Sequence, residues 1–122
     1  MKTKTYEDLI VWQKSHVLVL EVYKLSKYFP KEELFSLTNQ LRKAAISIPA
    51  NIAEGYGRIS QKEKIRFLNI SQGSLNETKY FLRLAHELNY ANTLSAQTHC
   101  IEISKMLFAC IKSIRLNPPT TY

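Results

Sequence analysis

The stretch that decides the fold is residues 34–56, which read LFSLTNQLRKAAISIPANIAEGY. Its apolar side chains recur every three or four residues, at Leu34, Leu37, Leu41, Ala44, Ile48 and Ile52. This spacing places them on one face of an α-helix, as in packed helical bundles. Pro49 stands inside the pattern, where it removes one helical hydrogen bond.

The same periodicity continues on both sides of this stretch. Pro30 separates it from an earlier segment, and Gly55, Gly57 and the cap-forming Ser60 separate it from a later one. We predict helices at about residues 8–29, 31–56, 61–88 and 94–115. Because short connections make long helices antiparallel neighbours, residues 1–122 are expected to form one all-α domain, an up-down-up-down four-helix bundle.

The segment 8–29 has apolar residues on two faces. One series is Val11, Leu18, Val22, Leu25 and Phe29, and the other is Leu9, Trp12, His16, Val19 and Tyr23. Packing against a single neighbouring surface would use only one such stripe. We therefore expect this helix to serve an interface between subunits as well.

The composition limits the possible classes of protein. Hydrophobic residues make up 45% of the chain and charged residues 22%, which is typical of a globular protein. No apolar run approaches the ~20 residues of a membrane span, and Glu7 and Asp8 fall where a signal peptide needs an apolar core. We expect a cytoplasmic protein without a membrane partner.

The formal net charge of +7 favours an acidic partner such as RNA or DNA. The candidate phosphate contacts are Arg42, Lys43, Arg58, Lys62 and Arg66, and the nearby Tyr56 could stack on a base. The alternative is a solvated basic face that serves only solubility.

The residues that usually carry chemistry are scattered. His16, His86 and His99 fall on three different predicted helices, none with a partner at a metal-binding spacing. Cys100 and Cys110 lie about 15 Å apart along one predicted helix and cannot pair, so we expect small buried hydrophobes. We predict no catalytic residue, no metal site and no cofactor.

Glu54 and Glu77 each lie among small or apolar residues, which suggests burial. Buried carboxylates can act as general acids or bases, but an ion pair with Arg42 or Arg58 that fixes the register of the bundle is the favoured interpretation. Gly73 precedes Ser74 within a predicted helix. Since a mid-helix glycine costs ~1 kcal/mol relative to alanine, it suggests a close crossing or a local bend.

One pattern in the chain is recognisable. It comprises Phe29-Pro30, Glu33, Leu37, Gln40 and then Arg42-Lys43-Ala44-Ala45-Ile46-Ser47-Ile48-Pro49-Ala50-Asn51-Ile52-Ala53-Glu54-Gly55, with Leu9-Ile10-Val11-Trp12 before it and Phe67-Leu68, Gly73-Ser74-Leu75 and Glu77 after it. This pattern resembles the bacterial four-helix bundle family named for the 23S ribosomal RNA intervening sequence proteins.

The resemblance implies a four-helix protomer that assembles as a ring-like pentamer. The fold is also similar to the accessory protein of diversity-generating retroelements, a basic barrel that binds nucleic acid and a reverse transcriptase. The matching positions imply a shared structural network, formed by Pro49, Asn51, Glu54, Gly55, Gly73, Ser74 and Glu77. Gln72 departs from the family, in which this position is often basic.

Three hypotheses follow. The first is a noncatalytic oligomer that binds nucleic acid through phosphate contacts. The second is a protein adaptor or accessory scaffold, for example for a reverse transcriptase, whose charge serves only solubility. The third is a metal-dependent hydrolase or nuclease built on Glu54 and Glu77, for which no set of metal ligands is visible.

Overall fold

The computed structural model describes residues 3–116, and within that range it contains four α-helices and no strand. The helices are α1 (Ile10–Ser26), α2 (Leu37–Tyr56), α3 (Gln61–Glu87) and α4 (Leu94–Leu116). Two 3-10 turns, η1 (Tyr6–Asp8) and η2 (Lys31–Glu33), precede α1 and α2. The all-α prediction is confirmed for this part of the chain.

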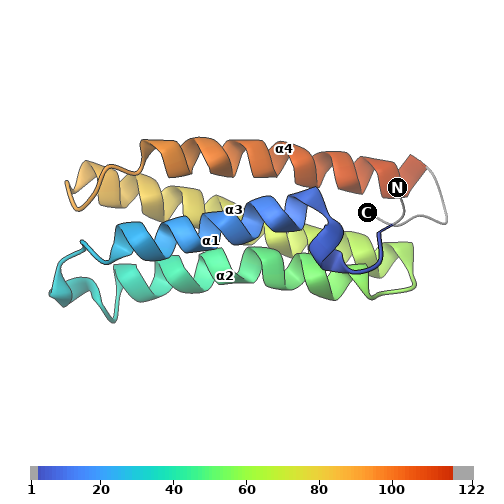
Figure 1. Cartoon of the computed structure of the whole chain (residues 1–122), viewed down its shortest axis with the longest axis horizontal. Coiled ribbons are helices and arrows are strands. Elements are labelled where there is room, and N and C mark those ends of the chain that lie inside the picture. The colour runs from blue at the N-terminus through green and yellow to red at the C-terminus, as the bar shows by residue number, and fades with distance from the viewer. Residues whose placement is uncertain (1–2, 117–122) are drawn as a thin grey trace.

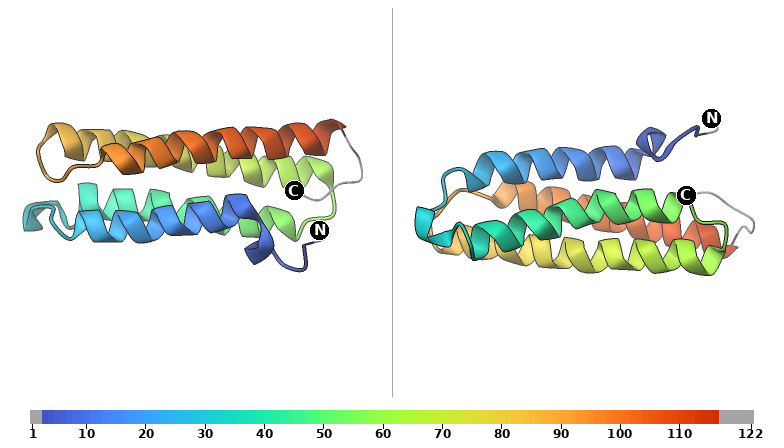
Figure 2. Two further views of the ribbon diagram at one scale, coloured as in Figure 1. Left: turned by 45° about the horizontal axis from the view of Figure 1, so that its top comes forward. Right: turned by 90° about the horizontal axis from the view of Figure 1, so that it is seen from below.

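The chain runs back and forth along the long axis of the molecule, each helix starting at the end where the previous one stops (Figures 1 and 2). Side-chain hydrogen bonds connect helices that are consecutive in the chain. The Ser71 hydroxyl of α3 donates to the Ile48 carbonyl of α2 at 2.9 Å, and the Gln72 amide donates to the Ser104 carbonyl of α4 at 2.9 Å. α2 and α3 share the most extensive interface.

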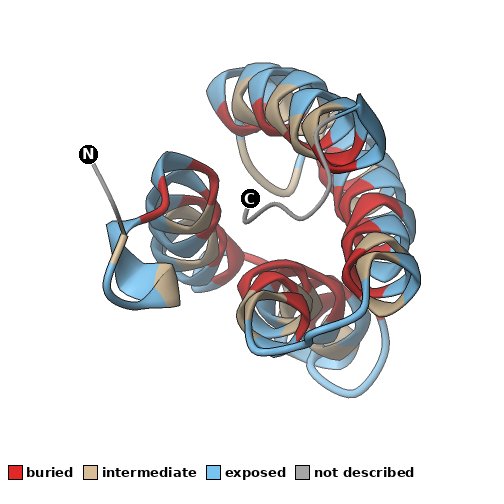
Figure 3. Ribbon diagram, turned by 90° about the vertical axis from the view of Figure 1, so that its right-hand side faces the viewer, coloured by how far each residue is buried: buried red, intermediate tan, exposed pale blue. Residues whose placement is uncertain are grey.

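The buried residues of the four helices face one common centre (Figure 3). The core contains leucine and isoleucine side chains with at most 2% exposure, namely Leu18, Leu41, Ile48, Ile52, Leu68, Leu75, Leu82, Ile103, Leu107 and Ile114. Burying each such side chain contributes roughly 1.5–3 kcal/mol. The apolar stripe of residues 37–52 is therefore the α2 contribution to this core.

The first two helices are shorter than the sequence suggests. α1 spans Ile10–Ser26 instead of 8–29, and α2 starts at Leu37 instead of residue 31. The backbone leaves the helical region at Ser36, with φ −125° and ψ −100°, and the Ser36 hydroxyl donates to the Glu33 carboxylate. Leu34, expected on the core face, is consequently 48% exposed.

The loops at one end of the bundle are tied together. The Tyr90 hydroxyl donates to Glu33 Oε2 at 2.8 Å, and the Tyr90 and Phe29 rings lie 5.7 Å apart between centroids. Asn89, just past the end of α3, has a positive φ of 62°, which lets the Tyr90 amide reach the Ala85 carbonyl at 2.9 Å. The connection between α3 and α4 thereby fixes the one between α1 and α2.

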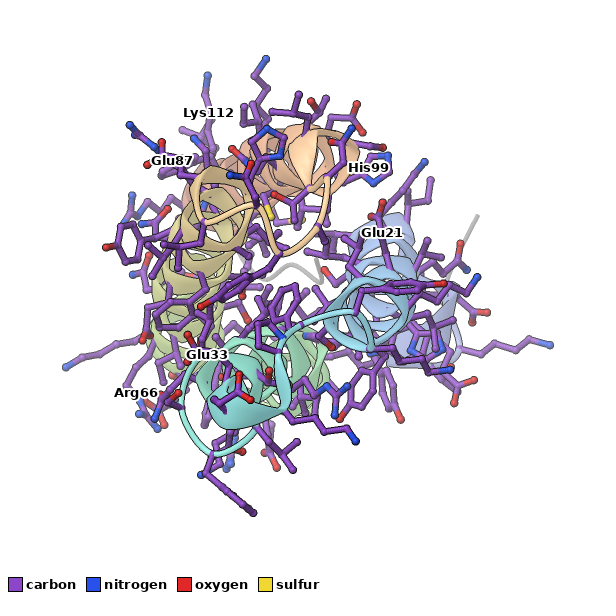
Figure 4. The ribbon with its side chains drawn as sticks, turned by 90° about the vertical axis from the view of Figure 1, so that its left-hand side faces the viewer. Glu21, Glu33, Arg66, Glu87, His99 and Lys112 are labelled. Carbon is purple, nitrogen blue, oxygen red and sulfur yellow. The ribbon has the colours of Figure 1, made fainter. Side chains whose placement is uncertain are left out.

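A polar pair joins the first and last helices. His99 Nδ1 of α4 lies 2.8 Å from Glu21 Oε1 of α1, and Figure 4 shows the two side chains facing each other.

Within residues 3–116, none of the helices combines the length and the hydropathy that crossing a membrane requires.

Candidate nucleic-acid interface

The structure divides the five predicted phosphate contacts into two groups. Arg58, Lys62 and Arg66 gather where α2 ends and α3 begins, and we call this region, with Glu54 and Glu63, the α2–α3 corner. Arg42 and Lys43 lie about 20 Å further back along α2, at 1.5 Å per residue. The five residues therefore do not form one patch.

Arg42 is engaged within the fold. Its Nε donates to the Ser26 hydroxyl at 2.9 Å, and its guanidinium lies 4.7 Å from the centroid of the Tyr23 ring. Both partners belong to α1, so Arg42 joins α1 to α2 and is half-buried. Lys43 is exposed.

At the corner, both arginines are paired with carboxylates. Arg58 lies 3.0 Å from Glu54, and Arg66 donates to the two Glu63 oxygens at 2.9 and 3.2 Å. The two guanidiniums also lie over the same Phe67 ring, 4.9 and 4.5 Å from its centroid. An aromatic face attracts cations electrostatically, which accounts for their convergence.

The charges of the corner act on one another. The hydrogen bond from Arg66 is the main cause that holds the pKa of Glu63 below its ordinary value, with further lowering from the charges of Arg58 and Lys62. The same bond raises the pKa of Arg66. Three cations and two carboxylates leave the corner with a small positive excess.

Glu54 and Glu77 are not buried, so the prediction of a buried ion pair is wrong. Glu54 does pair with Arg58, but the two side chains are 60% and 46% exposed. Glu77 is exposed too, and it lies about 20 Å along α3 from Glu63. Glu54 lies at the corner with Glu63, so Glu54 and Glu77 are too far apart to share a metal ion.

The predicted structural network is present in part. The Asn51 amide donates to the Ser47 carbonyl and hydroxyl, and the Ser74 hydroxyl bonds to that of Ser47 at 2.8 Å. Of these contacts, only the bond between Ser74 and Ser47 links α2 to α3. The buried Pro49 lies between Ser47 and Asn51, and α2 continues through it without a break.

The two glycines of that network differ. Gly55 is buried, whereas Gly73 is exposed, and a Cβ at position 73 would meet nothing within 4 Å. The close crossing expected at Gly73 is therefore absent from the protomer. Gln72 next to it is buried in a reciprocal pair with Ser104 of α4, which explains how an amide can replace a basic residue here.

Lys64 is a residue that the sequence analysis missed. Its side chain is buried, with 5% exposure, and its ammonium donates to the Tyr56 carbonyl at 2.9 Å and toward that of Gly55 at 3.4 Å. Burial lowers the pKa of Lys64. The cation thus caps the C-terminal end of α2, where unpaired carbonyls favour positive charge.

Tyr56, the candidate for stacking on a base, is half-buried and has contacts within the fold. Its hydroxyl lies 2.8 Å from that of Thr3, and the Lys64 ammonium lies 5.8 Å from the centroid of its ring. A shallow hollow of about 460 Å³ lies nearby, lined by Tyr6, Ala50, Ala53, Glu54, Gly57 and Arg58.

The histidines contact neighbouring groups, whereas the two cysteines form no disulfide. His16 stacks on Trp12 with 5.2 Å between centroids, and His86 Nδ1 accepts from the Thr93 amide at 3.2 Å. Cys100 and Cys110 are free thiols, and burial raises the pKa of Cys100 to about 12. Across residues 3–116, no three His, Cys, Asp or Glu side chains are grouped to hold a metal ion.

Comparison with known proteins identifies the family of this chain. A family model described as 23S rRNA-intervening sequence protein matches residues 7–109. The chain belongs to this family. It is also similar to a protein with unknown function from the S23 ribosomal protein family of Bacteroides thetaiotaomicron VPI-5482, whose crystal structure was determined at 1.70 Å resolution.

The two chains are 30% identical, with a TM-score of 0.78, and the match covers 84% of this chain and 99% of the Bacteroides chain. No curated protein sequence matches significantly. The resemblance to the 23S rRNA intervening sequence proteins is confirmed, and the similarity to the Bacteroides structure supports the fold described above.

Proposed function

We propose that this family member is a cytoplasmic, noncatalytic oligomer that binds RNA or DNA through phosphate contacts. The observation that carries the proposal is the convergence of Arg58, Lys62 and Arg66 at the α2–α3 corner of a chain with a net charge of +7. Three cations within one short stretch of surface can contact successive phosphates of a strand.

The ion pairs at the corner are compatible with this role. Arg58, Arg66 and their carboxylate partners are all more than 40% exposed. Exposed pairs of this kind contribute only about 0–1 kcal/mol, so a phosphate can replace the carboxylate at little cost. The Phe67 ring would keep both guanidiniums in place during the exchange.

The test is binding of fluorescein-labelled RNA and DNA, single-stranded and duplex, across a salt series. For duplex, log affinity should fall with log salt by about 0.9 per neutralised phosphate. The variant Arg58→Gln/Lys62→Gln/Arg66→Gln should flatten this slope by about 2.7 units, or 0.9 for each of the three lost contacts. The matched control Lys24→Gln/Lys27→Gln/Lys31→Gln loses the same three charges from another region. Equal slopes for both variants and the wild type would exclude the corner.

The oligomeric part of the proposal rests on two apolar surfaces of α1. On one side, Trp12, His16 and Val19 of α1 form a groove of about 270 Å³ with Tyr6 of η1 and with Ile46, Pro49, Ala50 and Ala53 of α2. On another side, Ile10 and Val17 are 61% and 57% exposed, and Val17 lies beside His99 and Ile103 of α4.

The exposed Ile10 and Val17 lie on one side of α1 and the groove lies on another. Two different surfaces of this kind fit copies arranged head to tail. Such a heterologous contact closes into a ring when the rotation between subunits permits. We infer a homo-oligomer, and the pentamer that the resemblance implies would collect about five times +7, or +35, in one particle. Light scattering checks the assembly: Ala50→Glu should yield monomers, whereas Lys24→Glu should not.

A second candidate function is that of an adaptor for a partner protein such as a reverse transcriptase. Tyr28 and Phe35, in the loop between α1 and α2, are 80% and 89% exposed, which is unusual for aromatic side chains. A partner held there should stay bound at high salt in a pull-down and be lost from Tyr28→Ser/Phe35→Ser. Loss of the partner at high salt would instead favour a contact through nucleic acid.

A further inference from the structure

A second cationic surface, which the sequence analysis did not single out, lies between α3 and α4. A groove of about 240 Å³ there has Asn76 and Lys79 of α3 on one side and Ile101, Ser104, Lys105 and Phe108 of α4 on the other. The buried Leu75 and Cys100 form its floor. We call this surface the α3–α4 groove.

The groove differs from the corner in its charges. Lys79 and Lys105 are exposed, neither lies in an ion pair with another residue of the range 3–116, and no carboxylate lines the groove. The acidic residue of α4 that is closest in sequence, Glu102, lies on the α1 side of its helix with Lys14 and His99. The groove therefore presents unneutralised positive charge.

The groove continues along α4 as a line of exposed side chains. Ile101, Lys105, Phe108, Lys112 and Arg115 follow one another at intervals of four and three, so they share one helix face. They extend over about 21 Å at 1.5 Å per residue. Lys112 lies on the outer side of α4 in Figure 4, away from the core.

Phe108 gives this line a second property. Its side chain is 62% exposed between Lys105 and Lys112 on the same face, although a phenylalanine gains by burial. An exposed aromatic ring between phosphate-binding cations is the arrangement on which unpaired bases stack, because every base has a π face. The bases of a duplex already stack on one another and cannot use such a ring.

From these observations we propose that the α3–α4 groove binds a single-stranded segment of nucleic acid, with phosphates on Lys79, Lys105 and Lys112 and a base stacked on Phe108. The proposal rests on the proposed function, since it assigns a strand preference and a second site to the same activity. An acidic peptide would satisfy the lysines equally well but would gain nothing from the open face of Phe108.

The experiment measures fluorescence anisotropy of labelled oligo(dT), oligo(U) and a mixed-sequence duplex. Lys79→Glu/Lys105→Glu should weaken single-strand binding at least about tenfold and flatten the salt slope by about 1.4, or 0.7 for each phosphate. The matched control Lys24→Glu/Lys27→Glu also lowers the net charge from +7 to +3 but should keep the wild-type slope. Circular dichroism verifies folding, and Lys79→Gln/Lys105→Gln replaces the reversal if that variant unfolds.

Phe108 separates the possible ligands. Phe108→Ala should weaken oligo(dT) binding at least about fivefold, Phe108→Tyr should restore it, and duplex binding should change less than twofold. An unchanged affinity of Phe108→Ala for oligo(dT), or competition by oligoglutamate that is as strong as competition by oligo(dT), would overturn the single-strand assignment.

Two outcomes distinguish this proposal from the proposed function. If the wild type binds oligonucleotides and the groove variants bind equally well, only the groove assignment fails. If the wild type binds none of the three probes, nucleic-acid binding itself fails, and the groove assignment fails with it.

Discussion

The α2–α3 corner and the α3–α4 groove are both cationic, yet they hold their cations differently. At the corner, Arg58 and Arg66 each contact a carboxylate at about 3 Å. In the groove, Lys79 and Lys105 have no such partner among residues 3–116. An anion that binds Arg58 or Arg66 must compete with a carboxylate, whereas one that binds Lys79 or Lys105 displaces only water. The count of basic residues in a segment is therefore a poor measure of the charge that it offers.

Removing the carboxylates of the corner should abolish this difference. In Glu54→Gln/Glu63→Gln, Arg58 and Arg66 lose their partners while the amides keep the shape of the side chains. We expect affinity for duplex to rise about tenfold, with a steeper salt slope, because more phosphates are neutralised without competition. Anisotropy titrations measure both quantities. No gain in affinity would mean that the corner lies outside the binding surface.

Arg42 sharpens the comparison because it belongs to neither region. Arg42→Met removes a charge together with the bond to Ser26 and the contact with Tyr23, so the free energy of unfolding should fall by about 1 kcal/mol. Nucleic-acid affinity should change less than twofold. Urea unfolding and anisotropy give the two values. A larger loss of affinity with intact stability would return Arg42 to the interface.

Gly73 lies on α3 between the corner and the groove. A substitution at this position tests whether another copy of the chain covers that stretch of α3. Gly73→Ala should raise the free energy of unfolding by about 0.5–1 kcal/mol, since the added methyl group meets no atom and the helix gains propensity. Thermal unfolding checks this expectation. A stabilised variant that no longer assembles would instead place a second copy against α3 at this point.

The smallest expected effect concerns the stability of the fold at low pH. Because the pKa of Glu63 is held below 4.5, mainly by Arg66, its ionised form stabilises the fold above pH 4.5, and this contribution is lost as the pH falls through the lower value. Glu63→Gln should therefore show a shallower decline in melting temperature below pH 4.5. Lys79→Gln, which alters no carboxylate pair, should decline as the wild type does.

The sequence predicts the number and type of the elements because each helix carries its own apolar stripe. It places the start of α2 too early, since the bond between Ser36 and Glu33 and the ψ of −100° at Ser36 depend on local geometry that the apolar stripe does not report. It predicts burial for Glu54 and Glu77 from their small neighbours. Small residues accompany exposed turns as readily as close crossings, and composition alone does not separate the two.

The candidate site was less predictable for a related reason. Arg58, Lys62 and Arg66 are close in sequence, so their proximity could be inferred. Lys79 and Lys105 meet only because α3 and α4 are set in register by pairs such as Gln72 with Ser104. The burial of Lys64 is likewise explained by its hydrogen bond to the C-terminal end of α2. The periodicity of α3 does not reveal this neighbour.

The positive φ of Asn89 limits how this end of the molecule can change during evolution. Glycine, asparagine and aspartate adopt that conformation readily, whereas most other side chains are strained there by about 1–2 kcal/mol. A β-branched replacement would unwind the end of α3 and pull Tyr90 away from Glu33 and Phe29. The loop between α1 and α2, which carries the exposed Phe35, is held in place through Tyr90. Its conformation therefore depends on Asn89, a residue more than fifty positions later in the chain.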